Sequence, residues 1–177
     1  MMADFLPVFL AVIAIAGRIC VGSIFCLAAL GKLAHWRILP GVIANYRLLP
    51  RAAVGPAALL LPPLELTLGT ALIAGVTLGW VVPTAAALLL LFAGAMAINL
   101  RRGRDAIDCG CGQAHLRQTI SMTLVARNAV LAALLLPSLG APASVTLPIL
   151  LAGIGAGLAF ALLGSLLNAI SALALPA

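Results

Sequence analysis

Five long apolar stretches constrain this chain more than any other feature of its sequence. Each is close to or above the about 20 residues that a helix needs to cross the hydrocarbon core of a bilayer. A chain that is 64% hydrophobic and only 8% charged cannot cover its own surface in water. We therefore predict an all-α membrane protein, a bundle of about five transmembrane helices in one integral membrane domain, residues 1–177. The predicted spans lie near residues 5–33, 52–78, 80–100, 120–136 and 147–175.

The first stretch is interpreted as a membrane span and not as a cleaved signal peptide. No positive charge precedes it, its apolar run is too long, and Arg18 lies inside it. The net charge of +6 does not indicate a nucleic-acid partner, because the basic residues are spread over short connections and not over a separate domain. The expected partner of this surface is the lipid bilayer.

The basic residues predict the orientation. Four lie between the first and second spans and four between the third and fourth, and the other connections and the C-terminal tail contain none. By the positive-inside rule, both basic connections face the cytoplasm of a bacterial inner membrane, with the N-terminus outside and the C-terminus cytoplasmic. The alternative role for these charges is binding of anionic lipid headgroups. They are Lys32, Arg37, Arg47, Arg51, Arg101, Arg102, Arg104 and Arg117.

Charged residues inside the spans are the next informative feature, because they usually face the bundle interior and mark function or an ion pair. Arg18 and Glu65 each lie on the order of 20 Å from the cytoplasmic ends of their spans, at 1.5 Å per residue. We predict that they form a buried charge pair, with a structural role or a role in proton or electron transfer. Arg127, followed by Asn128, lies roughly 14 Å from the same side.

Helical periodicity distinguishes the two cysteines of the first span. Arg18, Cys26 and Lys32 fall on one helical face, together with Gly22 and Ala29. Cys26 lies roughly 10 Å from the cytoplasmic end, close to the predicted level of Arg127, which could stabilise its thiolate. Cys20 points to another side and is expected to be a small packing residue.

The sequence Asp108-Cys109-Gly110-Cys111-Gly112 is the strongest candidate for chemistry. Two thiols separated by one glycine, in a polar connection beside the membrane, are poor candidates for hydrophobic packing. A disulfide closed over a single residue is strained and therefore easily reduced. The pair suits thiol–disulfide exchange, which would make the protein an oxidoreductase. Binding of a soft metal ion, with His115 as a further ligand, and an inert pair of thiols are the alternatives.

Several motifs together resemble the MauE family, the methylamine-utilisation membrane proteins related to DoxX-type redox-associated proteins. The resemblance covers roughly residues 15–130, and the Asp-Cys-Gly-Cys-Gly run is its most specific part. The motifs, in order, are Arg18, Gly31-Lys32-Leu33, Tyr46-Arg47-Leu48-Leu49-Pro50, Leu61-Pro62-Pro63-Leu64-Glu65, residues 95–100 leading into Arg102-Gly103-Arg104, Asp108-Cys109-Gly110-Cys111-Gly112 and Arg127-Asn128.

The resemblance implies a four-helix DoxX-like core plus one C-terminal span. It also implies a role in maturing methylamine dehydrogenase, whose small exported subunit carries many disulfides, together with a thioredoxin-like partner. Cys109 and Cys111 match the paired cysteines of the family, so the redox role is carried over to these two residues. Gln113 stands where the family usually has an aromatic residue, which bears on partner contacts at this loop.

The implied partner and the predicted orientation conflict. Disulfides of an exported enzyme form outside the cytoplasm, whereas the charges place Cys109 and Cys111 inside. Electrons would cross the bundle by way of Cys26 and a membrane quinone, or the loop would exchange with a cytosolic reductant, or the topology is inverted. The alternative function is a soft-metal-ion permease, in which Cys26 and the loop pair hand over a thiophilic ion.

Overall fold

The computed structural model describes residues 2–76, 79–109, 119–140 and 146–174. This part of the chain contains six α-helices and one short 3-10 helix. Its only β-type pairing is an isolated bridge between Asp108 and Thr119. The helices are α1 (Met2–Ala34), α2 (Leu39–Asn45), α3 (Arg51–Ile73), α4 (Val81–Arg101), α5 (Met122–Leu134) and α6 (Leu147–Ala174), with η1 (Leu136–Leu139) after α5.

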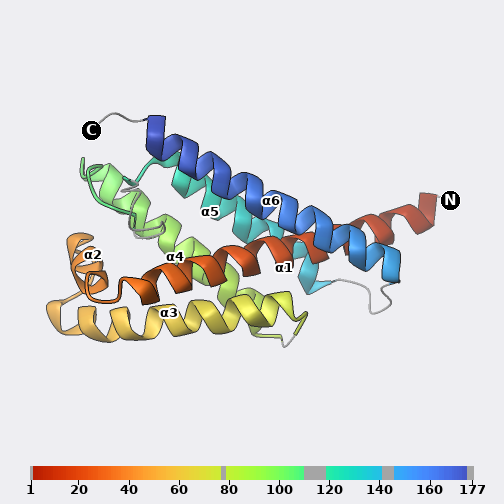
Figure 1. The fold of residues 1–177 in the computed structure, drawn as a ribbon, viewed down its shortest axis with the longest axis horizontal. Helices are drawn as coiled ribbons and strands as arrows, with labels where there is room; N and C mark the ends of the chain where they lie inside the picture. Colours follow the sequence, from red (N-terminus) through yellow and green to blue (C-terminus); the bar gives the residue numbers. More distant parts are fainter. Residues whose placement is uncertain (1, 77–78, 110–118, 141–145, 175–177) are drawn as a thin grey trace.

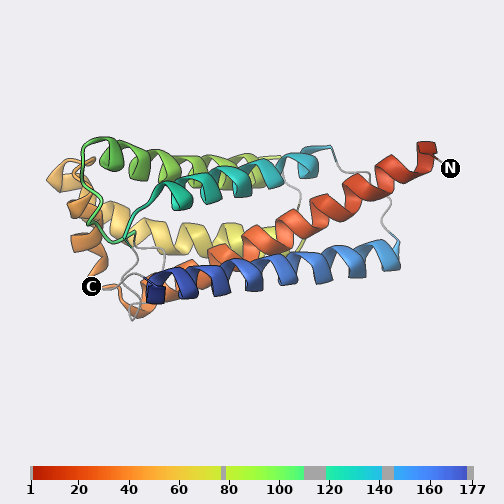
Figure 2. The same ribbon diagram turned by 90° about the horizontal axis from the view of Figure 1, so that it is seen from above.

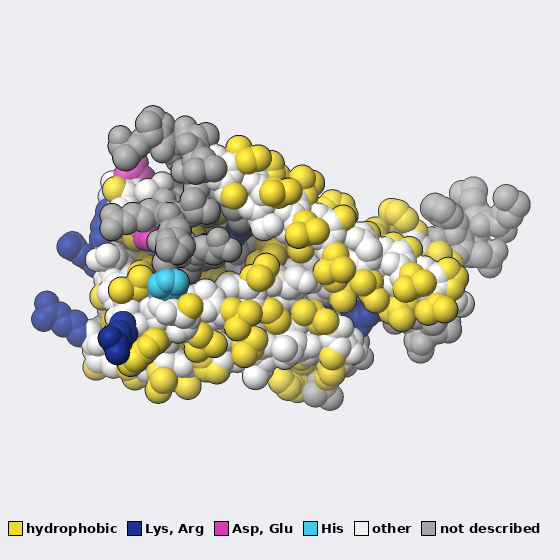
Figure 3. Space-filling model, viewed as in Figure 1, with side chains coloured by type: hydrophobic (Ala, Val, Ile, Leu, Met, Phe, Trp, Pro, Cys, Tyr) yellow, Lys and Arg dark blue, Asp and Glu magenta, His cyan; other side chains and the backbone are white. Residues whose placement is uncertain are grey.

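Five of these elements are long and apolar enough to cross a membrane, which confirms the predicted all-α bundle. The spans are Leu6–Ala34, Arg51–Ile73, Val81–Arg101, Met122–Leu139 and Leu147–Leu167. Large apolar side chains remain exposed along their outer faces, most extensively on α6. Apolar side chains cover much of the face seen in Figure 3. A surface of this kind is matched by lipid and not by water. The chain is a multi-pass membrane protein.

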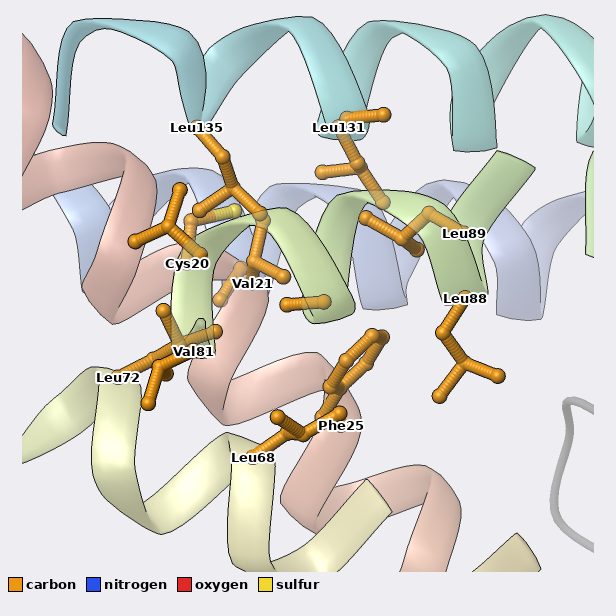
Figure 4. Close-up of a cluster of buried hydrophobic side chains, with 14 residues drawn as sticks. Cys20, Val21, Phe25, Leu68, Leu72, Val81, Leu88, Leu89, Leu131 and Leu135 are labelled. Atoms are coloured by element: carbon orange, nitrogen blue, oxygen red, sulfur yellow. The ribbon is translucent and has the colours of Figure 1, made fainter. Parts of the chain in front are cut away.

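Helix α1 is the centre of one layer and packs between α3 and α6 (Figure 1). Helices α4 and α5 pair with each other in a second layer (Figure 2). A buried cluster joins the two layers, and Phe25 of α1 points into it between residues of α3 and α4 (Figure 4). The cluster's labelled members are Cys20, Val21, Phe25, Leu68, Leu72, Val81, Leu88, Leu89, Leu131 and Leu135.

Glycines allow α1 to approach α3 closely. A Cβ atom on Gly22 would lie 2.8 Å from the carbonyl oxygen of Gly69, and a Cβ on Gly69 would lie 2.8 Å from Cys26 Sγ. Close backbone approach through small residues is the usual way in which membrane helices gain packing energy, because lipid supplies no hydrophobic drive between them. These contacts set the register of α1 against α3.

The connections α1–α3 and α4–α5 lie at the same end of the bundle, where α2 crosses it (Figure 1). Most Lys and Arg side chains visible in Figure 3 gather at this end. The charge asymmetry along the chain thus becomes an asymmetry between the two ends of the molecule.

Candidate functional site

Arg104 anchors the loop that follows α4. Its Nη2 donates to the backbone oxygen of Asn45 at 2.8 Å, and its Nη1 donates to Asn99 Oδ1 at 2.9 Å and to the backbone oxygen of Tyr46 at 3.5 Å. Asn99 is fully buried and donates its Nδ2 to the backbone oxygen of Ala95. The guanidinium therefore ties the end of α4 to the C-terminal carbonyls of α2, where a cation is favoured by the helix dipole.

The same loop carries Cys109 inward. Asp108 forms an isolated antiparallel bridge with Thr119, and the backbone N–H of Ile120 donates to the Ile107 oxygen at 2.9 Å. Cys109 is buried, and the hydroxyl of Tyr46 donates to its backbone oxygen at 3.2 Å. Its position is therefore set both by the bridge at the base of the loop and by the end of α2.

Cys109 lines a cavity of about 640 Å³ between α2, α3 and α4. The cavity walls are apolar apart from Lys32, Tyr46 and Cys109. Leu60 and Leu91 line it and are also exposed, so the cavity opens laterally between α3 and α4. The remaining lining residues are Leu39, Val42, Ile43, Leu48, Leu49, Ala57, Leu61, Leu64, Phe92, Gly94, Ala95, Met96 and Ile98.

Glu65 pairs with Lys32, so the prediction that it pairs with Arg18 is wrong. Lys32 Nζ lies 2.7 Å from both carboxylate oxygens of Glu65, and Glu65 is 1% exposed. The ammonium also lies 5.7 Å from the ring centroid of Phe92, within cation–π range. Arg18 lies elsewhere, with its Nη1 3.5 Å from the position that a Cβ on Gly75 would take.

The register of the two helices explains the error. The contacts of Gly22 with Gly69 place Arg18 level with Gly75, about 15 Å along α3 from Glu65 at 1.5 Å per residue. The depth argument assumed that both helices end at the same level, but α3 extends past the end of α1 by on the order of 10 Å. Glu65 is therefore level with the last turns of α1. The Lys32 side chain reaches it because helical side chains lean toward the N-terminus.

The face of α1 that carries Arg18, Cys26 and Lys32 packs against α3. Cys26 Sγ lies against Gly69, one helical turn from Glu65, and Cys26 is half-buried. It is not among the described residues that line the cavity with Cys109. Cys20 lies in the apolar cluster between the layers, as expected for a packing residue.

The two intramembrane arginines share an unusual feature. The Nε atoms of Arg18 and Arg127 are buried, and neither has a hydrogen-bond acceptor among the described residues. Asn128 is buried and donates its Nδ2 to the backbone oxygen of Leu124 at 2.9 Å. A role of Arg127 in stabilising a Cys26 thiolate stays a prediction.

The predicted soft-metal site includes two residues that the structure does not describe. Cys111 and His115 lie in the segment 110–118, outside the described residues. Within the described ranges, no group of three or more His, Cys, Asp or Glu side chains is placed to hold a metal ion. The set of Cys109, Cys111 and His115 therefore stays a prediction.

Sequence reasoning gave no individual role to Lys32, Tyr46, Asn99 or Arg104. The sequence places Lys32 on the face of Arg18 and Cys26 and marks it as an orientation signal, but it does not indicate Glu65 as its partner. The signal that could have identified Asn99 and Arg104 is their spacing, because residues five apart across a helix end can bond through a long side chain. No local signal indicates that Tyr46 meets Cys109, since 63 residues separate them.

Comparison with known proteins agrees with the motifs. The family model described as methylamine utilisation protein MauE matches residues 10–141. The MauE protein of Paracoccus denitrificans is 43% identical over 178 residues, covering 97% of this chain and 94% of that protein. Its counterpart in Methylorubrum extorquens is 45% identical over 105 residues, covering 59% of this chain and 56% of that one. No solved structure matches the chain significantly. The chain therefore belongs to the MauE family of methylamine utilisation proteins.

Proposed function

We propose that this protein serves methylamine utilisation as a thiol-redox membrane protein. Its cysteine pair, Cys109 and Cys111, exchanges disulfides with a thioredoxin-like partner. Through that partner it assists disulfide formation in an exported amine dehydrogenase subunit. Membership of the MauE family supports the role in methylamine utilisation. The thiol chemistry is the finer part of the proposal and depends on the site.

The observation that carries the proposal is the placement of Cys109. A bridge at the base of the loop, the Tyr46 hydroxyl and the Arg104 clamp all hold this segment against the membrane bundle. Cys109 also packs in a small apolar cluster with Met96, Ile107, Ile120 and Leu124, so the loop has to open before its sulfur can react. An anchored thiol beside a second one is suited to exchange, because the resolving thiol is within reach without movement of any helix.

The exchange takes place in two steps. A thiolate of the partner attacks the disulfide between Cys109 and Cys111, so one mixed disulfide forms and the intramolecular bond breaks. The second partner thiolate then attacks the mixed disulfide and releases the reduced pair. Two electrons pass from the partner to this chain, and the partner's new disulfide is the oxidant for the exported cysteines.

For the orientation, we propose an N-terminus outside the bacterial inner membrane, with the Cys-Gly-Cys loop and the C-terminus in the cytoplasm. The distribution of eight basic residues against none supports this orientation. Reducing equivalents from an exported subunit then have to cross the bundle to reach the loop. The thiol–disulfide exchange at the loop balances on either side of the membrane, whereas direct oxidation of the exported cysteines by the same partner requires the loop to face outside. The orientation and the exchange are therefore tested separately.

The exchange is tested by trapping the mixed disulfide. Cys109→Ser and Cys111→Ser variants of the full-length protein are expressed in a methylamine-grown host and quenched in acid with an alkylating agent. In either variant the remaining loop thiolate can attack the partner's disulfide, the reverse of the proposed step, and the missing second loop thiol can no longer release the reduced partner. A covalent adduct with a thioredoxin-fold protein should therefore accumulate on a non-reducing gel and be identified by mass spectrometry. Cys20→Ala is the matched control and should give no adduct, because both loop thiols remain and resolve the mixed disulfide.

Maturation of the exported enzyme is the second measurement. Either loop variant should lower the fraction of amine dehydrogenase subunit with complete disulfides, whereas Cys20→Ala should leave it unchanged. Normal maturation in a double variant that lacks both loop thiols would contradict the redox role and leave the interpretation of Cys109 and Cys111 as an inert pair of thiols.

A further inference from the structure

We infer that the cavity between α2, α3 and α4 binds the ring of a lipophilic quinone, which accepts electrons from the loop thiols. This inference rests on the proposed function for the identity of the electron donor. The binding site itself rests on the geometry of the cavity and on the residues that line it.

The size and opening of the cavity fit such a ligand. Its volume of about 640 Å³ lies in the range of ordinary small-molecule sites, and its walls are almost wholly apolar. The lateral opening beside Leu60 and Leu91 lies on the lipid-facing surface of α3 and α4. A ligand dissolved in the bilayer can therefore enter without crossing water, and its apolar tail can remain in lipid.

The polar groups of the cavity suit a neutral ring that carries carbonyl oxygens. Lys32 lines the cavity, and its ammonium has three N–H donors, two of which suffice for the contacts with Glu65. No other described residue accepts a hydrogen bond from Nζ, so at least one N–H is available to a carbonyl. Phe92 and Tyr46 also line the cavity and supply aromatic side chains against which an aromatic ring can pack.

The ion pair also argues against an anionic lipid as the natural occupant. The carboxylate of Glu65 lies 2.7 Å from the Lys32 ammonium and neutralises its charge. A phosphate headgroup would meet a pair with no net positive charge, together with an apolar wall. A neutral acceptor of hydrogen bonds gains the Lys32 donor without the desolvation of a second anion.

Cys109 lines the same cavity, which places a thiol beside the ligand. One quinone takes two electrons and two protons from the reduced cysteine pair. The pair becomes a disulfide, and the quinone becomes a quinol that leaves into the bilayer. This step regenerates the disulfide that the proposed exchange consumes.

The test uses the full-length protein in phosphatidylcholine nanodiscs, labelled with an azido-ubiquinone photoprobe and competed with decylubiquinone. Gly94 lines the cavity, and a Cβ there would meet no atom within 4 Å, so Gly94→Phe adds a large side chain at the cavity wall at a position that is open to substitution. Gly155 on the lipid face of α6 is equally open, which makes Gly155→Phe the matched control. Ala57→Phe, also on the cavity wall, is a second filling variant should Gly94→Phe fail to accumulate.

We expect saturable labelling of peptides from α3 and α4. Gly94→Phe should raise the half-maximal decylubiquinone concentration at least about tenfold, and Gly155→Phe should change it less than about twofold. Non-saturable labelling, an equal effect of both variants, or equal competition by phosphatidylglycerol would each overturn the quinone site.

The mixed-disulfide trap separates this inference from the proposed function. If the partner adduct forms but decylubiquinone does not compete, the quinone site is wrong and the exchange stands. If decylubiquinone competes at the cavity but no adduct forms, the quinone site stands and the proposed exchange is wrong.

Discussion

Lys32 in the last turn of α1 and Glu65 in the middle of α3 form a buried, two-pronged ion pair, with Nζ 2.7 Å from each carboxylate oxygen. The pair joins two helices 33 residues apart in sequence and forms part of the cavity wall. In a low-dielectric bundle each charge is tolerated because of the other.

Removal of one member of the pair should therefore destabilise the protein strongly. Lys32→Met leaves the Glu65 carboxylate buried without its cation, and Glu65→Met leaves the ammonium without its anion. The expected loss is about 3–5 kcal/mol for either variant. Yield and thermal aggregation midpoint in detergent are the measurements.

The double variant Lys32→Met/Glu65→Met is the control for that experiment. Because it buries no charge, it should regain most of the lost stability. Single variants as stable as the wild type, or a double variant no better than the singles, would show that the ion pair does not set stability.

The close approach of α1 and α3 predicts that Gly69 does not tolerate a methyl group. Gly69→Ala places a Cβ 2.8 Å from Cys26 Sγ and 2.9 Å from the Gly22 oxygen, so the helices must separate. We expect a loss of about 1–3 kcal/mol, the usual range for overpacking. Gly155→Ala, where no atom lies within 4 Å, should be neutral or gain up to about 1 kcal/mol through helix propensity. Equal unfolding midpoints for the two variants would contradict this packing.

Arg104 should control access to Cys109. Arg104→Gln removes the bonds to the Asn45 oxygen and to Asn99, so the loop should open more often and expose the buried thiol. We expect Cys109 to react with a maleimide about tenfold to a hundredfold faster, the range that corresponds to loss of a charged hydrogen bond of about 1.5–3 kcal/mol. Arg102→Gln, at an exposed position of the same connection, is the control and should leave the rate unchanged.

The orientation can be tested with single reporter cysteines at the two ends of α4. Because Cys109 is buried, a cysteine at exposed Arg102 is a better reporter of the loop side, and one at exposed Trp80 reports the other side. In a background without native cysteines, a membrane-impermeant maleimide applied to spheroplasts should label Trp80→Cys. Arg102→Cys should react only after the membrane is opened. The reverse pattern would invert the topology drawn from the arginines.

Much of the fold could be predicted from the sequence, because the signals that specify it are local. Hydropathy alone predicted five apolar stretches, and the structure has five helical segments long and apolar enough to cross a membrane, since a bilayer requires a continuous apolar helix. Helical periodicity also identified the face of α1 that carries Arg18, Cys26 and Lys32, because side chains three or four residues apart lie on one side.

The partners of that face were decided only by the tertiary structure. The predicted pairing of Arg18 with Glu65 was based on their depths, counted from the ends of the spans. The contact between Gly22 and Gly69 sets a different register of α1 against α3, and this register brings Lys32 to the Glu65 carboxylate. Helix register depends on where two surfaces can approach most closely, and that property belongs to neither helix alone.

The candidate site divides in the same way. The sequence by itself determined that two thiols follow one another in a polar connection at the end of a span. Only the folded chain brought Tyr46 to the Cys109 carbonyl and Asn45 to Arg104, and only folding enclosed an apolar cavity beside that thiol. The physical reason is that a cavity is the space that packed helices leave unfilled, so it exists only once α2, α3 and α4 have taken their places.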